Sequence, residues 1–380
     1  GYDRRIASGV IAASGTLAQI IPPSLVLIIL ADQLGRSVGE MYKGAFLPGF
    51  ILTGMYVLFI MGVAIFRPQW VPALPLSART IREDNGKSGL LSLLLLTILC
   101  TFSAVYLAQS YPAILDYFKG STGSNPAADE TIVVSLCCGV LLAFLLAVVN
   151  KTTRLGLLSN MAERVTFVLI PPLLLIFLVL GTIFLGLAAP TEAAAIGAFG
   201  AMVVAAIHRR LSWTILRLAL EQTAKATAMV MWIVFGANAF VGFYIAQGGD
   251  RYVSELLLGT GLSPWGILLL MQGILIVLGM FLDWVGILLL AVPVFVPIIR
   301  DLGFDPLWFG VLYLVNMQIS FLSPPFGYAL FYVRGVAPQV PMGTIYKAAL
   351  PFLFLQLVGL ALVMLFPGLA TWLPSVVYGR

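Results

Sequence analysis

One stretch of this sequence occurs twice, and each copy carries two adjacent prolines inside an apolar run. The pairs are Pro22-Pro23 and Pro324-Pro325, and the two copies share a constant offset of 302 residues. A proline pair removes two backbone donors and clashes with the preceding helical turn. Each copy is long enough to span a bilayer, which takes about 20 residues. The sequence therefore predicts two membrane helices that are interrupted in the same way.

The composition places these helices in a membrane protein with many spans. The mean hydropathy is +1.04, and only 10% of the residues are charged, against about 25% in soluble domains. Long apolar runs favour an all-α polytopic protein over a β-barrel. The net charge of +5 follows from asymmetric loops, so we expect no nucleic-acid partner.

The chain divides into three parts on this basis. Residues 1–66 form the end of a first repeat, 67–164 form polar loops with two extra spans, and 165–380 form a second repeat. Spans are expected at 6–30 (broken), 44–66, 89–108, 132–149, 165–189, 191–207, 226–246, 307–333 (broken) and 343–366, with an interfacial amphipathic helix at 211–225.

The apolar region 265–299 is too short for two spans and a turn. Its roughly 35 residues fit a re-entrant hairpin better, with the tip near Asp283. Either arrangement returns the chain to the side from which it came.

The distribution of basic residues predicts the orientation. If Gly1 lies inside, the inner loops hold 15 of the 21 lysines and arginines, as the positive-inside rule requires. Seven crossings then separate Gly1 from the hairpin, so Gly303 enters from the opposite face. This inverted repeat is typical of secondary transporters. Because a hairpin precedes only the second copy, we expect the chain to be an N-terminally truncated fragment in which a matching hairpin precedes Gly1.

Small polar residues next to each interruption are the candidate ion- and substrate-binding groups. Their hydroxyl, amide and freed carbonyl oxygens could bind Na⁺, and the helix ends could attract an anion. The alternative is that the prolines only kink the helices, as we expect for Pro171-Pro172. The candidates are Ser14, Gly15, Thr16, Pro22, Pro23 and Ser24 in the first copy, and Asn316, Gln318, Ser320, Ser323, Pro324, Pro325 and Gly327 in the second.

Two acidic residues remain at membrane depth, where carboxylates are costly and often functional. Asp283 is predicted at the hairpin tip, with a polar or ion-linked role or a role as cap of the second hairpin arm. Glu192 is a possible site residue together with Thr191. The alternative is a helix start that Thr191 caps while Glu192 faces the positive end of the dipole.

The motifs of several functional classes are missing from the sequence. The sequence has no nucleotide-binding loop, catalytic triad, metal-ligand cluster or redox motif. We therefore expect no enzymatic activity and no cofactor, and an ion gradient as the energy source. The three cysteines lie in apolar runs, and His208 lies at a span end beside two arginines.

Three motifs in order resemble one transporter family: Ala12-Ala13-Ser14-Gly15-Thr16, Pro190-Thr191-Glu192-Ala193-Ala194-Ala195 and Ser323-Pro324-Pro325-Phe326-Gly327. The chain is similar over nearly its whole length to the large membrane subunit of tripartite ATP-independent periplasmic (TRAP) transporters. The extra spans within 89–149 resemble the longer subgroup labelled for mannitol or chloroaromatic compounds.

The resemblance implies an elevator-type fold of the ion-transporter superfamily, in which hairpins and broken helices form the moving domain. It implies Na⁺-driven uptake of an organic acid across the bacterial inner membrane. It also implies a small four-helix membrane subunit and a periplasmic substrate-binding protein as partners, besides membrane lipid. Two alternatives stay open: a stand-alone anion or dicarboxylate transporter of the same superfamily, and a membrane scaffold without transport activity.

Overall fold

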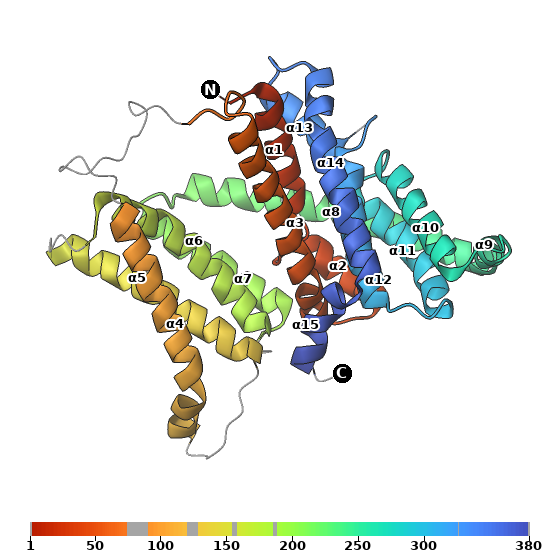
Figure 1. Ribbon diagram of the computed structural model, residues 1–380. Coiled ribbons are helices and arrows are strands. Elements are labelled where there is room, and N and C mark those ends of the chain that lie inside the picture. Colours follow the sequence, from red (N-terminus) through yellow and green to blue (C-terminus); the bar gives the residue numbers. More distant parts are fainter. Residues whose placement is uncertain are drawn as a thin grey trace. The chain divides into compact units, whose positions relative to one another are not determined.

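The computed structural model describes residues 2–73, 90–119, 128–153, 158–184, 188–325 and 327–378, and these form only α-helices and connections (Figure 1). The chain folds as two compact units, Gly1–Ala73 with Arg217–Arg380, and Leu74–Leu216. Eight of the described helices are long and apolar enough to cross a membrane. The predicted all-α polytopic class is confirmed.

The first repeat copy is interrupted where its prolines lie. Helix α1 (Arg4–Leu17) ends before the proline pair and α2 (Leu25–Leu34) begins after it, and the bond between the two prolines is cis. A long helix, α3 (Val38–Phe66), follows and contains Pro48. Pro48 thus stays within a helix, whereas the pair Pro22-Pro23 interrupts one.

The second copy repeats this arrangement. Helix α12 (Pro306–Leu322) ends before the second proline pair, α13 (Tyr328–Val336) begins after it, and the proline–proline bond is again cis. Helices α14 (Met342–Leu365) and α15 (Gly368–Tyr378) complete the chain. Helix α12 is buried from Leu307 to Leu322, as expected for a helix that is apolar on nearly all sides. Both predicted interruptions are confirmed.

The predicted hairpin corresponds to α10 (Pro264–Gly279) and α11 (Trp284–Asp301), which pack against each other and against α12. It follows α8 (Trp213–Ala246) and the short α9 (Gly249–Leu258). Re-entry of the two arms from one side of the membrane stays a prediction. Of the two arms, α11 is long and apolar enough to cross a membrane, and α10 is shorter.

Within this unit the two copies run in opposite directions. Helix α1 packs against α13 and α14, whereas α2 packs against α11 and α12. At the end of α2, the carbonyl oxygen of Leu34 accepts a hydrogen bond of 3.3 Å from Arg300, near the end of α11. The end of the first copy thus lies beside the start of the second, as the predicted inverted repeat requires.

The other unit is a run of antiparallel neighbours: α4 (Leu90–Lys119), α5 (Ala128–Thr153), α6 (Asn160–Phe184) and α7 (Pro190–Ile207). Leu96, Ala143 and Ile170 form its buried core. Both Pro171 and Pro172 lie inside α6, which continues through them as the single predicted span.

Some expected boundaries are wrong. The interfacial helix 211–225 and the span 226–246 are one helix, α8, because residues 217–228 contain no glycine or proline and consist largely of good helix formers. Residues 109–119, expected in a loop, continue α4, which contains Pro112. The basic loop residues Arg79, Arg82, Lys87 and Arg154 lie outside the described residues.

Candidate functional site

The two interrupted helices begin with the same cap. Asp3 Oδ1 accepts a hydrogen bond of 2.7 Å from the backbone N–H of Arg5 ahead of α1, and Asp305 Oδ1 accepts one of 2.8 Å from Leu307 ahead of α12. These aspartates satisfy donors that a helix start leaves unpaired. The sequence repeat is therefore also a structural repeat.

The helices that follow the interruptions, α2 and α13, begin without such a cap. Neither Ser24, ahead of α2, nor Gly327, ahead of α13, forms a side-chain cap. The Ser24 hydroxyl instead donates to the Gln19 carbonyl oxygen at 2.6 Å, and the Ser323 hydroxyl donates to Ile319 at 2.7 Å. Each interruption therefore presents an uncapped helix N-terminus, which carries partial positive charge and suits an anion.

A tyrosine lies against each interruption. The Tyr346 hydroxyl donates to the carbonyl oxygen of Pro325 at 2.6 Å. Tyr42, which follows the first copy as Tyr346 follows the second, is fully buried and has a backbone hydrogen-bond interaction with Ser24. The two tyrosines help to hold the interruptions in place.

An amide network joins the hairpin to the second interrupted helix. Asn316 Nδ2 donates to the Gln272 backbone oxygen at 2.9 Å and to Gln272 Oε1 at 2.6 Å. One turn later, the Ser320 hydroxyl approaches the Ile276 carbonyl oxygen at 3.5 Å and donates to the Asn316 carbonyl oxygen at 3.2 Å. Asn316 Oδ1 is buried and has no hydrogen-bond partner. The network therefore holds one unused oxygen inside the unit.

Gln318 does not join this network. It lies two residues after Asn316, about 200° further round α12, and both of its side-chain polar atoms are buried without a hydrogen-bond partner. The structure thus brings Asn316 and Ser320 together, while Ser323 bonds within its own helix.

Asp283 lies at the tip of the hairpin, as predicted, and caps its second arm. Its carboxylate accepts a hydrogen bond of 3.3 Å from the backbone N–H of Val285. The carboxylate also interacts electrostatically with Tyr313 of α12 and with Tyr328, the first residue of α13. The Tyr313 hydroxyl donates to the Trp284 carbonyl oxygen at 3.1 Å. The hairpin tip therefore lies next to the second interruption.

The polar residues of the first copy are largely satisfied within their own helix. The Thr16 hydroxyl is buried and donates to Ala13 at 2.9 Å, and the Ser14 hydroxyl donates to Ile11 at 3.3 Å. Ser14, Gly15 and Pro23 are exposed, whereas Pro22 is buried. This copy presents an open face at its interruption.

Thr191 and Glu192 lie in the other unit, at the start of α7. The N-cap is Ala189, so the expected cap by Thr191 is wrong. Pro190 suits the first helical position, and the cap therefore lies two residues earlier than expected. Glu192 Oε2 accepts a hydrogen bond of 2.8 Å from Ala189 N–H. Glu192 thus stabilises the helix start, as the alternative interpretation proposed.

Oxygen atoms dominate the polar groups at the second interruption. Among the described residues, no group of three or more His, Cys, Asp and Glu could hold a metal ion. Amide, hydroxyl and carbonyl oxygens suit a hard cation instead.

Sequence reasoning missed Gln272, the partner of Asn316. Its signal was a lone amide inside the otherwise apolar run 265–282. Nothing in the sequence pairs it with a residue 44 positions away.

Comparison with known proteins supports one family over the whole chain. The family model described as "Tripartite ATP-independent periplasmic transporter, DctM component" matches residues 1–369. The C4-dicarboxylate TRAP transporter large permease protein DctM of Pseudomonas aeruginosa is 26% identical over 376 residues, which cover 99% of this chain and 69% of the relative.

Two further relatives carry other substrate names. The sialic acid TRAP transporter large permease protein SiaM of Vibrio cholerae is 30% identical over 379 residues, 100% of this chain and 69% of the relative. The isethionate TRAP transporter permease protein DctMQ of Oleidesulfovibrio alaskensis is 30% identical over 97% of this chain and 45% of its own length. With its long apolar helices, the chain therefore belongs to the DctM component family of the tripartite ATP-independent periplasmic transporters, multi-pass transport proteins of the inner membrane and not a class of enzyme.

Proposed function

We propose that this chain imports an organic acid anion by coupling its movement to Na⁺. The observation that supports this proposal is the pair of antiparallel interrupted helices, whose second halves both begin with uncapped N-termini. Two such ends inside a membrane protein attract a carboxylate, while unwound backbone and neutral side chains leave oxygens for a cation. Both interruptions and the hairpin belong to one compact unit, which suits a transport domain that moves as a rigid body in an elevator mechanism.

The second interruption supplies a fitting set of Na⁺ ligands. Asn316 Oδ1 is a buried acceptor without a hydrogen-bond partner, and the proline pair removes the N–H groups that would reach the carbonyl oxygens of Ser320 and Phe321 in a continuous helix. The hydroxyl of Ser320 is adjacent to Asn316. A neutral oxygen shell would leave the positive helix end free to hold the anion. The first copy, with Ser14 and Thr16, would supply a second Na⁺ site that is also lined by neutral oxygens.

The substrate class follows from the site and from the relatives. The relatives' names mention C4-dicarboxylates, sialic acid and isethionate, all of which are anions. The family name describes a transporter of three components. We accordingly assign this chain a small membrane subunit and a periplasmic substrate-binding protein as partners.

The test is uptake by the complete transporter in liposomes, with the binding protein loaded with a radiolabelled organic acid. We expect uptake with an inward Na⁺ gradient and little uptake with an equal K⁺ gradient. Asn316→Ala should raise the Na⁺ concentration needed for half-maximal uptake, and Gln339→Ala, at an exposed position outside the site, should not. Uptake that is indifferent to Na⁺ would refute the coupling.

A second measurement separates this proposal from a stand-alone transporter. If the chain works alone, omission of the binding protein and small subunit should leave uptake unchanged. We expect omission of either component to abolish it.

A further inference from the structure

Gln272 is a buried amide inside an apolar helix. It lies in the middle of α10, is 3% exposed, and belongs to a run, 265–282, that contains no other amide and no charged side chain. A buried amide is costly unless its polar groups find partners. Within the described part of the chain, its side-chain oxygen is paired with Asn316 of α12.

The two oxygens of Gln272 use both hydrogens of the Asn316 amide nitrogen. Asn316 Nδ2 donates at 2.9 Å to the backbone oxygen of Gln272 and at 2.6 Å to its Oε1, and a side-chain amide nitrogen carries two hydrogens. If the Asn316 amide were rotated by half a turn, its oxygen would face two acceptors and no donor. The chemistry of Gln272 therefore fixes the orientation of the Asn316 amide.

This orientation leaves Asn316 Oδ1 as the free group of the amide. Asn316 is fully buried, and its Oδ1 has no hydrogen-bond partner in the described residues. An amide oxygen carries two lone pairs and is a ligand that hard cations prefer. Gln272 thus makes Asn316 present an oxygen, rather than N–H groups, to its buried surroundings.

Close packing of α10 on α12 maintains this geometry. One turn after Asn316, the Ser320 hydroxyl donates to the Asn316 carbonyl oxygen at 3.2 Å and lies 3.5 Å from the Ile276 carbonyl oxygen. A Cβ atom on Gly279 would lie 2.3 Å from Ser320 Cβ. The two helices therefore approach each other closely on the side of Asn316, which leaves Gln272 little freedom to turn away.

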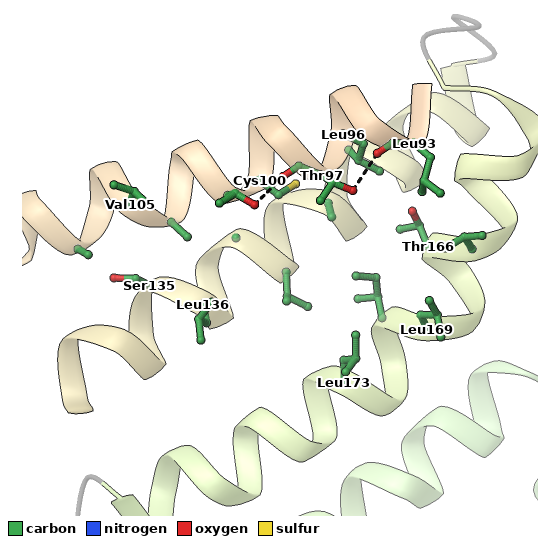
Figure 2. A pocket seen from close by; sticks show the side chains of 18 of the residues that line it. Leu93, Leu96, Thr97, Cys100, Val105, Ser135, Leu136, Thr166, Leu169 and Leu173 are labelled. Atoms are coloured by element: carbon green, nitrogen blue, oxygen red, sulfur yellow. Dashed lines mark hydrogen bonds between the residues drawn. The ribbon is translucent and has the colours of Figure 1, made fainter. Parts of the chain in front are cut away.

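Polar side chains of the other unit are satisfied in a different way. Helices α4, α5 and α6 line an apolar groove of about 490 Å³ (Figure 2). On this groove, the hydroxyls of Thr97, Thr101 and Thr166 donate to backbone oxygens of their own helices at 2.9, 2.8 and 2.7 Å. Such bonds do not fix a side chain of one helix against another helix, as Gln272 does with Asn316.

We propose that Gln272 is a positioning residue of the Na⁺ site and holds the Asn316 amide so that Oδ1 faces the cation. This inference rests on the Na⁺ coupling proposed above. Removal of a group that orients a metal ligand without contacting the metal commonly lowers metal affinity about 10–100-fold. A residue that only joined two helices would affect folding and leave the Na⁺ affinity of the folded protein unchanged.

The test measures Na⁺ affinity in two ways on the complete transporter, with choline replacing Na⁺ at constant ionic strength. The first is the rise of the thermal unfolding midpoint with Na⁺ concentration in detergent, because a ligand that binds the folded state stabilises it. The second is the Na⁺ concentration for half-maximal uptake in liposomes. Gln272→Met removes the side-chain acceptor at similar volume and should raise the half-saturating Na⁺ concentration about tenfold in both assays.

Three further variants separate positioning from a structural role. Gln272→Glu retains an oxygen acceptor for Asn316 Nδ2 and should not raise the half-saturating Na⁺ concentration. Gln356→Met removes from α14 a buried amide that has no hydrogen-bond partner, and it should leave the Na⁺ affinity unchanged. If Gln272→Met does not fold, Gln272→Asn takes its place, because the amide is kept and the shorter side chain draws its oxygen away from Asn316.

Two results would overturn the role of Gln272. An unchanged half-saturating Na⁺ concentration in the folded Met or Asn variant, with a lower unfolding midpoint, would mean that Gln272 only joins α10 to α12. An equal rise in Gln272→Met and Gln272→Glu would mean that the side-chain oxygen does not position Asn316. If the unmodified protein shows neither a Na⁺-dependent midpoint nor Na⁺-dependent uptake, the proposed Na⁺ coupling itself fails.

Discussion

Arg36 and Asp305 join the end of the first interrupted helix to the start of the second. Arg36 Nη2 lies 3.5 Å from Asp305 Oδ1, the same oxygen that caps α12. The two side chains are 32% and 45% exposed, so solvent screens the pair and its contribution to stability is small. The cap, not the ion pair, should be the stabilising interaction of Asp305.

This distinction predicts different effects for two substitutions. Asp305→Asn keeps a capping side chain and loses the charge, so the free energy of unfolding should fall by less than about 1 kcal/mol. Asp305→Ala removes the cap and should cost about 0.5–2 kcal/mol. Thermal unfolding of the full-length protein in detergent measures both. Arg36→Gln is the control and should resemble Asp305→Asn; a loss as large as that of Asp305→Ala would show that the ion pair dominates.

The amide network predicts coupling between α10 and α12. Either Gln272→Leu or Asn316→Leu leaves buried polar groups without a partner and should lower the free energy of unfolding by about 1–3 kcal/mol. The double variant removes both side chains, so its loss should be smaller than the sum of the single losses. Gln339→Leu, on an exposed connection, serves as control. Strict additivity would mean that the two amides do not interact.

The close contact of the hairpin with α12 makes Gly279 sensitive to size. A Cβ atom there would lie 2.3 Å from Ser320 Cβ, so Gly279→Ala should destabilise the protein by about 1–3 kcal/mol. Gly273, in the same helix, has open space at its Cβ position, and Gly273→Ala should be neutral or stabilising.

A compensating substitution tests the cause of this loss. Ser320→Gly added to Gly279→Ala removes the clashing atoms and should restore part of the unfolding midpoint. If it restores nothing, steric contact with Ser320 is not the cause.

Two substitutions of Glu192 can separate its capping role from a role in transport. Glu192→Gln retains an oxygen for the Ala189 N–H and should change stability little, whereas Glu192→Ala should cost about 0.5–2 kcal/mol. If capping is its whole contribution, both variants transport at near-normal rates once folded. Loss of uptake in Glu192→Gln with an unchanged unfolding midpoint would establish a further role.

The sequence was sufficient for features that depend on local covalent chemistry. The interruptions at Pro22-Pro23 and Pro324-Pro325 were predicted because each pair lies next to small polar residues and recurs in both repeat copies, whereas Pro171-Pro172 stays inside α6. Predictions from the sequence were less reliable where a helix end depends on competing local signals. Thr191 looked like a cap, but Pro190 moved the start of α7 to follow Ala189.

Local chemistry alone specifies the membrane class, the two interruptions and, through the basic residues, the opposite directions of the two copies. These follow from hydropathy, proline geometry and the positive-inside rule, none of which requires knowledge of the neighbouring helices. The packing of the helices is needed to show that Asn316 contacts Gln272, that Gly279 contacts Ser320, and that α4, α5 and α6 leave a groove. Such contacts depend on how each helix is rotated and how closely it approaches its neighbour, because an amide or a glycine in an apolar run carries no signal that names its partner.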